Sequence, residues 1–183
     1  MTLYYRQIHS PVGKLKLIAN AQALVAVLWE RERPDRVRLG ALKREPRHPI
    51  LCEAERQLAE YFAGKRTRFD LPLALQGTPF QVKVWRALTK IPFAETKSYR
   101  AIASAVGAPK AARAVGAATG KNPLSIIVPC HRVVGRDGSL TGFAGGLETK
   151  AKLLALEARA AKRRTAARAF DSQPAERRAR ATD

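Results

Sequence analysis

Three short helical segments separated by tight turns constrain the fold of this chain more than any other feature of its sequence. Thr78-Pro79-Phe80-Gln81 predicts a helix start, because a threonine cap, a proline at the first helical position and a glutamine three residues after the cap complete a capping box. Ser98 is placed to cap a second helix that ends at Gly107, and Pro109 is expected to open a third that ends at Gly120. Short helices joined in this way indicate a helix-turn-helix unit.

The segment before this unit is patterned as strands and one helix. Residues 3–9, 14–19 and 23–29 are short apolar or alternating runs that lie close in sequence, which predicts an antiparallel meander. Residues 31–48 are charged and contain two prolines, so we expect a loop with room for one short helix. A helix is then expected from Pro49 to about residue 63, followed by a linker.

The segment after the unit predicts a buried strand, a loop, a helix and a tail. Residues 124–128 form an apolar run typical of a buried strand, and residues 141–146 contain three glycines and are expected to form a loop. An amphipathic helix is expected over 147–160. From residue 159 onward, alanine and arginine dominate without a sustained apolar face, which predicts a mostly disordered basic tail.

Charge and cysteine content narrow the class of protein. The net charge is +19, from 34 Lys and Arg against 15 Asp and Glu, so nucleic acid is the first partner to consider, with a solubilising surface as the alternative. Two cysteines cannot build a disulfide framework, and CxxC and HxxxH spacings are lacking, so no metal site is expected. Neither a signal peptide nor an apolar run of about 18 residues is found, which predicts a cytoplasmic protein without a membrane helix.

The third helix of the unit carries few long side chains. Residues 110–118 are mostly alanine and glycine, with Arg113 near the middle. Small side chains permit close approach to a minor groove about 6 Å wide, and Arg113 could then fill the space that a displaced base leaves. The residues alone leave open a second interpretation, an alanine-rich buried helix whose arginine pairs with a carboxylate.

The segment Pro129-Cys130-His131-Arg132 holds a potential nucleophile beside a potential base. A thiol reacts well only as the thiolate, and a nearby histidine can accept its proton directly or through a water molecule. Adjacent residues need not face each other, so these two residues alone favour an inert buried cysteine beside a capping histidine.

The ordered set of motifs resembles the O6-alkylguanine-DNA alkyltransferases, and within them the constitutive bacterial type. Residues 129–133 resemble the active-site signature of that family, and residues 110–116 resemble its DNA-binding helix. The similarity is strong over 78–157 and looser before residue 78. It extends to four further segments: Thr78-Pro79-Phe80-Gln81 with Trp85, Asn122-Pro123, Gly142–Leu147 and Lys152–Glu157.

The resemblance implies four catalytic roles. Cys130 would accept the alkyl group, and His131 would deprotonate it through a bound water. Glu157 would hold His131 in one tautomer and favour its protonated form. Asn122 would brace the turn before the cysteine.

The resemblance also implies how DNA is bound. Tyr99 would help to rotate the nucleotide and would donate its hydroxyl to the flipped guanine, while Arg113 would be the intercalating finger. The remaining predicted residues are the small side chains of the DNA-binding helix, Ala112, Ala114 and Gly116, and the alkylguanine pocket, Val133, Phe143 and Ala144. Because Ala144 is small, we expect a pocket that admits larger alkyl groups and O4-alkylthymine.

The fold class expected from the resemblance is α+β. Residues 1–77 would form a small N-terminal α/β domain with an antiparallel sheet, 78–158 a winged-helix-like domain for DNA binding and catalysis, and 159–183 the tail. The expected function is direct-reversal repair in which the alkyl group passes irreversibly to the cysteine, with no metal or organic cofactor. The expected partner is double-stranded DNA carrying an alkylated guanine, bound through its minor groove by a monomer that can cluster on DNA.

Three alternatives belong to other functional classes. A non-catalytic alkyl-lesion-binding protein would share the flipping residues but would lack Cys130. A winged-helix transcription regulator explains the charge and the helices but not Cys130, His131 and Glu157 together. A cysteine hydrolase would need neither the charge nor Arg113.

Overall fold

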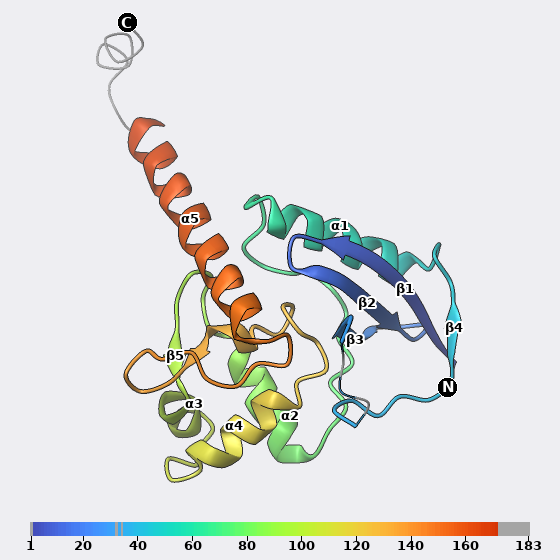
Figure 1. The fold of residues 1–183 in the computed structure, drawn as a ribbon, viewed down its shortest axis with the longest axis horizontal. Helices are drawn as coiled ribbons and strands as arrows, with labels where there is room; N and C mark the ends of the chain where they lie inside the picture. The colour runs from blue at the N-terminus through green and yellow to red at the C-terminus, as the bar shows by residue number, and fades with distance from the viewer. Residues whose placement is uncertain (1, 32, 34, 172–183) are drawn as a thin grey trace, which may run out of the picture.

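The N-terminal part of the molecule is a sheet with one covering helix (Figure 1). The computed structural model describes residues 2–31, 33 and 35–171. β1 (Leu3–Ser10), β2 (Gly13–Ala19) and β3 (Leu24–Trp29) form the predicted antiparallel meander. α1 (Pro49–Phe62) begins and ends close to the predicted positions. Its buried residues recur at helical spacing, and this stripe faces the sheet.

The expected loop over residues 31–48 is wrong in one respect. β4 (Leu42–Arg44) pairs parallel with β1, which gives the sheet order β3-β2-β1-β4, and the described residues of the segment contain no helix. Without β4, β1 would be an open edge of the sheet, and β4 pairs with the backbone groups of that edge. The charged sequence of this segment does not indicate that it contains a strand.

The C-terminal part consists of short helices and one long helix. α2 (Pro79–Leu88) starts with the predicted capping box between Thr78 and Gln81, and Ser98 caps α3 (Tyr99–Ala105) by accepting a hydrogen bond from Ala101. The other elements of this part are β5 (Lys97–Ser98), α4 (Ala112–Gly120), the 3-10 helix η1 (Cys130–Arg132), β6 (Val133–Val134) and α5 (Leu147–Asp171).

The predicted start of α4 and the strand predicted after it are both wrong. The helix begins at Ala112 rather than Pro109, because the Ala111 N–H closes a turn onto the Ala108 carbonyl and no side chain caps the helix. Residues 124–128 are buried as expected but make only isolated bridges, since the chain turns at Ile126 instead of running straight.

The predicted end of the last helix is also wrong. α5 continues to Asp171, so residues 159–171 do not form the disordered tail that the sequence suggested. The apolar face ends near Ala160, but alanine, arginine and lysine favour helix without tertiary contacts, and this local propensity carries the helix onward. The rest of the predicted tail, residues 172–183, lies outside the described residues.

One apolar core joins the two parts of the chain. It includes residues of the sheet and α1 together with residues of α2, α3, α4 and α5. The outer edge of β3 is bonded to later segments: Val27 N–H donates to the Pro123 carbonyl at 2.9 Å, and Leu24 exchanges backbone bonds with Pro72 and Ala74. The sheet edge is therefore tied directly to the turn that precedes Cys130.

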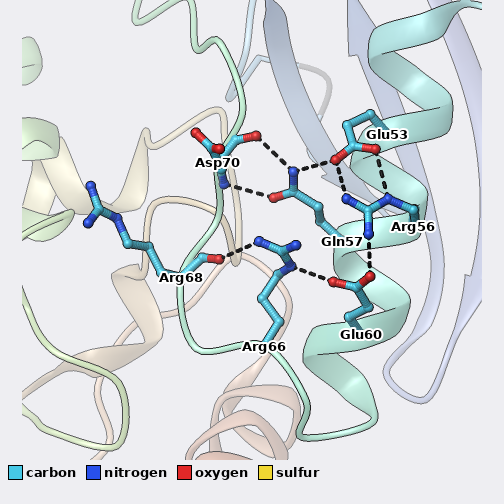
Figure 2. Close-up of polar contacts among 7 residues, drawn as sticks. All are labelled: Glu53, Arg56, Gln57, Glu60, Arg66, Arg68 and Asp70. Carbon is cyan, nitrogen blue, oxygen red and sulfur yellow. Dashed lines mark hydrogen bonds and ion pairs between the residues drawn. The ribbon is translucent and has the colours of Figure 1, made fainter.

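A polar network fastens the linker to α1 (Figure 2). The buried Gln57 amide donates to the Asp70 carbonyl at 2.7 Å and accepts from the Asp70 N–H at 2.8 Å. Around it, Arg56 pairs with Glu53 and Glu60, and Glu60 also binds Arg66. No helix in the described ranges is both long and apolar enough to cross a membrane.

We predict that Gln57→Leu lowers the free energy of unfolding by about 1–2 kcal/mol, because it removes the two hydrogen bonds that the buried Gln57 amide makes with the backbone of Asp70. Urea unfolding followed by circular dichroism measures the loss. Arg56→Ala is the matched control on the same helix, and it should cost much less because its ion pairs are exposed. Equal losses in the two variants would contradict this account of the network.

Candidate active site

Cys130 lies at the start of η1, directly after the turn of residues 122–128. The residue is 5% exposed. The Cys130 N–H and the Asn122 side-chain amide both donate to the Val128 carbonyl, at 2.8 and 2.9 Å. Asn122 therefore holds the backbone that carries the thiol.

The same turn contains a residue with unusual backbone geometry. Ile126 is fully buried and has a φ of 72°, in the left-handed region that β-branched residues avoid. Such a conformation persists only where the surroundings enforce it. Here Asn122 accepts from the Leu124 N–H at 3.0 Å and donates beyond the turn, so one side chain spans the strained segment.

Glu157 is the centre of the polar network beside the cysteine. Its carboxylate is fully buried on α5 and accepts hydrogen bonds from three other segments. The donors are Tyr61 Oη at 2.7 Å, His131 Nε2 at 2.7 Å, Arg132 Nη2 at 2.9 Å and the Ala94 N–H at 2.9 Å. The four lone-pair sites of the carboxylate thus have four donor groups around them.

The contact with Glu157 fixes the tautomer of His131. An ionised carboxylate can only accept, so His131 Nε2 carries the proton and, in the neutral ring, Nδ1 is the acceptor. Nδ1 is buried and has no hydrogen-bond partner among the described residues. The ring therefore presents a base on the side that does not face Glu157.

Burial and hydrogen bonding oppose each other in setting the charges of the network. Burial raises the pKa of Glu157, but hydrogen bonds from His131 and Arg132 outweigh it, together with the charge of Arg132 and that of His131 when it is protonated, and bring this pKa to about 2. Burial lowers the pKa of His131, against the opposing effect of Glu157. The resting site thus combines an ionised carboxylate with a neutral imidazole.

The thiol is also neutral in the resting site. Burial raises the pKa of Cys130, while a hydrogen bond from Asn122 and the charges of Arg36 and Lys150 act in the opposite direction. Lys150 is buried on α5 and donates to the Thr141 carbonyl at 2.8 Å. Two cations and one amide are therefore placed to stabilise a thiolate once it forms.

A groove of about 1250 Å³ runs along α4 and the 141–144 loop. Six of the predicted residues line it, whereas Ala114 is exposed on α4 outside the lining and Val133 is buried, paired with Lys97. The predicted residues in the lining are Tyr99, Ala112, Arg113, Gly116, Phe143 and Ala144. Arginines of the N-terminal segment 33–38 also line the groove.

Tyr99 connects the two sides of this groove. Its ring lies against Gly116 of α4, where an added Cβ would be 3.8 Å from the ring. Its hydroxyl donates to the Thr141 carbonyl at 3.3 Å. Tyr99 therefore stands between the helix expected to meet DNA and the loop expected to hold the base.

The N-terminal part also supports the loop. The Trp29 indole at the end of β3 lies so close to Gly145 that an added Cβ would be 2.7 Å from it. Phe143 meets the same indole edge-on, with ring centroids 5.5 Å apart. Only glycine fits at position 145, so the indole sets the path of the loop.

Sequence reasoning missed several residues that complete the site. Tyr61 lies on the buried face of α1, but nothing in the sequence indicates that its hydroxyl reaches Glu157. Arg132 lies within the signature yet was given no role. For Lys150 the sequence does contain a usable signal. Lys150, Leu153 and Glu157 recur at helical spacing, which places them on one face of the helix, and the structure buries that face.

Comparisons with known proteins identify relatives of both parts of the chain. The family model for the ribonuclease-like domain of 6-O-methylguanine DNA methyltransferases matches residues 3–75, and the model for their DNA-binding domain matches residues 79–159. A methylated-DNA–protein-cysteine methyltransferase of Mycolicibacterium paratuberculosis is 48% identical over 155 residues, which cover 85% of this chain and 92% of that protein. The constitutive one of Bacillus subtilis is 47% identical over 158 residues, covering 84% and 94%.

A solved structure has the same fold. The crystal structure of Mycobacterium tuberculosis OGT in complex with DNA superposes with a TM-score of 0.80 at 45% identity, covering 86% of this chain and 94% of that one.

We predict that Tyr61→Phe lowers the free energy of unfolding by about 1.5–3 kcal/mol, because it removes a hydrogen bond to a buried carboxylate. The pKa of Glu157 is held near 2 against an ordinary 4.5, so its ionised state contributes stability above about pH 4.5 and loses it as the pH falls toward 2. The deficit should therefore be constant from pH 5 to pH 8, in urea unfolding. Tyr4→Phe is the control, and a comparable loss there would refute the assignment.

Proposed function

Because this chain belongs to the 6-O-methylguanine DNA methyltransferase family, we propose that it repairs O6-alkylguanine in DNA by transferring the alkyl group to Cys130, once per molecule. The observation that carries this proposal is a buried thiol beside a histidine with an open acceptor nitrogen, whose other ring nitrogen donates to a buried carboxylate. The thiol follows the turn of residues 122–128, and Pro123 of that turn lines the same groove as Tyr99 and Arg113. A non-catalytic lesion-binding protein or a winged-helix transcription regulator is not favoured, since the named relatives are methyltransferases.

DNA is the partner, and we propose that α4 enters its minor groove. Only small side chains stand on this surface of α4, at Ala112, Ala114 and Gly116, so the helix backbone can approach a narrow groove closely. The exposed Arg113 then takes the place of the displaced nucleotide, and Tyr99 helps to rotate the nucleotide. Base extrusion is required because the reacting carbon is out of reach inside the duplex.

The flipped base would lie between the 141–144 loop and the segment after Cys130. Phe143 supplies one apolar wall, while Val133 and Ala144 offer backbone groups to the base edge. Trp29 and Lys150 hold this loop in place from opposite ends. The pocket therefore exists before DNA arrives, which limits the ordering cost of binding.

The chemical step begins with proton transfer. The Cys130 proton passes through a water molecule to His131 Nδ1, and the resulting imidazolium is stabilised by Glu157 across the 2.7 Å contact. Asn122, Arg36 and Lys150 stabilise the thiolate. Tyr61 and Arg132 keep the carboxylate ionised and in place, so the proton stays on His131.

The thiolate then displaces guanine from the alkyl carbon. The new bond joins the cysteine sulfur to that carbon as the carbon–O6 bond breaks. Guanine departs with the electron pair and is neutralised by a proton from Tyr99, which the solvent restores. The thioether product offers no leaving group that His131 or water can displace, so each molecule acts once.

Three further properties are proposed on the same basis. The protein acts as a monomer that can cluster on DNA. Residues 1–77 and 78–158 are two domains that share the site, as the cross-domain bonds of Tyr61 and Val27 support. A cytoplasmic location stays a prediction from the sequence.

We predict a stoichiometric gain of one methyl group on the intact protein after mixing with duplex DNA that carries a single O6-methylguanine. Mass spectrometry of the whole chain measures the gain, and peptide mapping places it on Cys130. Cys130→Ala should abolish the gain, whereas Cys52→Ala, which removes the other cysteine, should retain it. Tight binding to the lesion without any mass gain would instead identify a recognition protein.

We predict that the small Ala144 side chain admits larger alkyl groups. The wild-type chain should repair O6-butylguanine at a measurable rate, although more slowly than O6-methylguanine because a primary alkyl carbon is intrinsically less reactive than methyl in an in-line displacement. Ala144→Ile, which narrows the groove, should lower butyl repair more than methyl repair. Single-turnover rates on the two duplexes provide an internal control, and negligible butyl repair by the wild type would refute the wide pocket.

A further inference from the structure

The last part of α5 leaves the body of the protein. Ala160 is the last buried residue of the helix. It packs so closely against Gly64 that a Cβ added to that glycine would lie 3.1 Å from the Ala160 Cβ. Every residue from 162 to 170 is exposed. At 1.5 Å per residue, the helix extends about 16 Å beyond Ala160 to Asp171.

This projecting segment is strongly basic. Its cations are Arg159, Lys162, Arg163, Arg164 and Arg168, and no acidic residue lies between positions 158 and 170. None of the five forms an ion pair in the described part of the chain. The surface therefore offers its full charge to an external anion.

The spacing of these cations costs the helix stability. Arg159 and Arg163 are four residues apart, as are Arg164 and Arg168, and like charges at this spacing repel on a helix surface. If these side chains contacted only solvent, nothing would compensate for the stability that the helix loses through this repulsion. A polyanion that neutralises the cations would relieve the repulsion and release counterions from its own backbone.

The helix end does not face the DNA that α4 would hold. Figure 1 shows α5 running away from α3 and α4, so that its end and α4 lie at opposite ends of the view. The groove lined by Tyr99, Arg113 and the 141–144 loop is on the α4 side. A duplex seated on α4 therefore leaves the end of α5 free for another anion.

We propose that the exposed end of α5, residues 159–170, binds the phosphate backbone of a second stretch of DNA while α4 holds the first. Double-stranded DNA is the occupant because the segment is uniformly cationic and the chain works on DNA, so this inference rests on the DNA binding in the proposed function but not on alkyl transfer. One molecule would then bridge two duplex segments and could pass between them without dissociating fully.

A bridging assay with lesion-free DNA tests the proposal. One duplex is immobilised, the full chain is added, and recruitment of a second, fluorescent duplex is measured. We expect the wild type to recruit the second duplex. The triple variant Lys162→Ala, Arg163→Ala, Arg164→Ala should recruit at least about fivefold less of it. The salt dependence of second-duplex binding should become shallower by about 0.9 for each phosphate that the variant no longer neutralises. Alanine is chosen because it retains helix propensity.

The matched control removes the same residue types from a distant surface. Lys43, Arg44 and Arg47 are exposed at the edge strand and the loop after it, and their replacement by alanine should leave bridging intact. Equal losses in both triple variants would mean that only total charge matters, and would overturn the proposal. So would a wild type that binds one duplex but never recruits another, or an α5 variant that bridges normally.

Methyl transfer to a lesion duplex is measured in parallel on each protein. If bridging fails while methyl transfer proceeds, the second DNA surface is wrong and the repair function stands. If bridging succeeds without methyl transfer, the repair chemistry is wrong and the surface stands.

Discussion

The Glu157 carboxylate determines how the parts of this protein meet. A carboxylate cannot be buried unless hydrogen bonds and opposite charge replace its hydration. Here the replacements come from α1, η1 and the loop at Ala94, so the carboxylate joins α5 to three segments that are distant in sequence. One of these contacts even imposes backbone strain, since Ala94 takes a φ of 64° to direct its N–H at Glu157. The same oxygen atoms thus hold the parts of the fold together and carry the catalytic role that we propose for Glu157.

This constraint gives the N-terminal part of the chain a direct place in the site. Tyr61 reaches Glu157, Trp29 sets the course of the base-binding loop, and Arg36 donates to the Asn122 carbonyl and brings a charge toward Cys130. The backbone bond between Val27 and Pro123 ties the sheet edge to the same turn. Separating the two parts would therefore remove a hydrogen bond, a packing surface and a cation from the reacting centre, and not merely expose an apolar interface.

The sequence predicted those features that depend on local chemistry. The capping box at Thr78, the cap at Ser98 and the helix that begins at Pro49 depend on neighbouring residues, and the structure confirms them. The motifs also drew attention to Cys130, His131 and Glu157, which the structure buries, with His131 bonded to Glu157. Features that depend on distant partners were missed: β4 forms because β1 offers an edge, residues 124–128 turn because Asn122 spans them, and the Tyr61 hydroxyl has meaning only beside Glu157. The prediction for the end of α5 is wrong for the opposite reason. Local helix propensity continues the helix beyond the apolar face, which was the basis of the predicted end.

The resting charges of the site suit a protein that can react only once. A thiolate present in advance would react with other electrophiles, whereas burial keeps Cys130 and His131 neutral in the resting site. Glu157 is a poor acceptor for the proton, because its donors hold its pKa near 2. In the mechanism we propose, the proton therefore passes to His131 Nδ1, which is buried with its acceptor site open. Arg36, Lys150 and Asn122 then stabilise the negative sulfur after the proton has moved. The carboxylate that organises the fold thereby also fixes the direction of proton transfer.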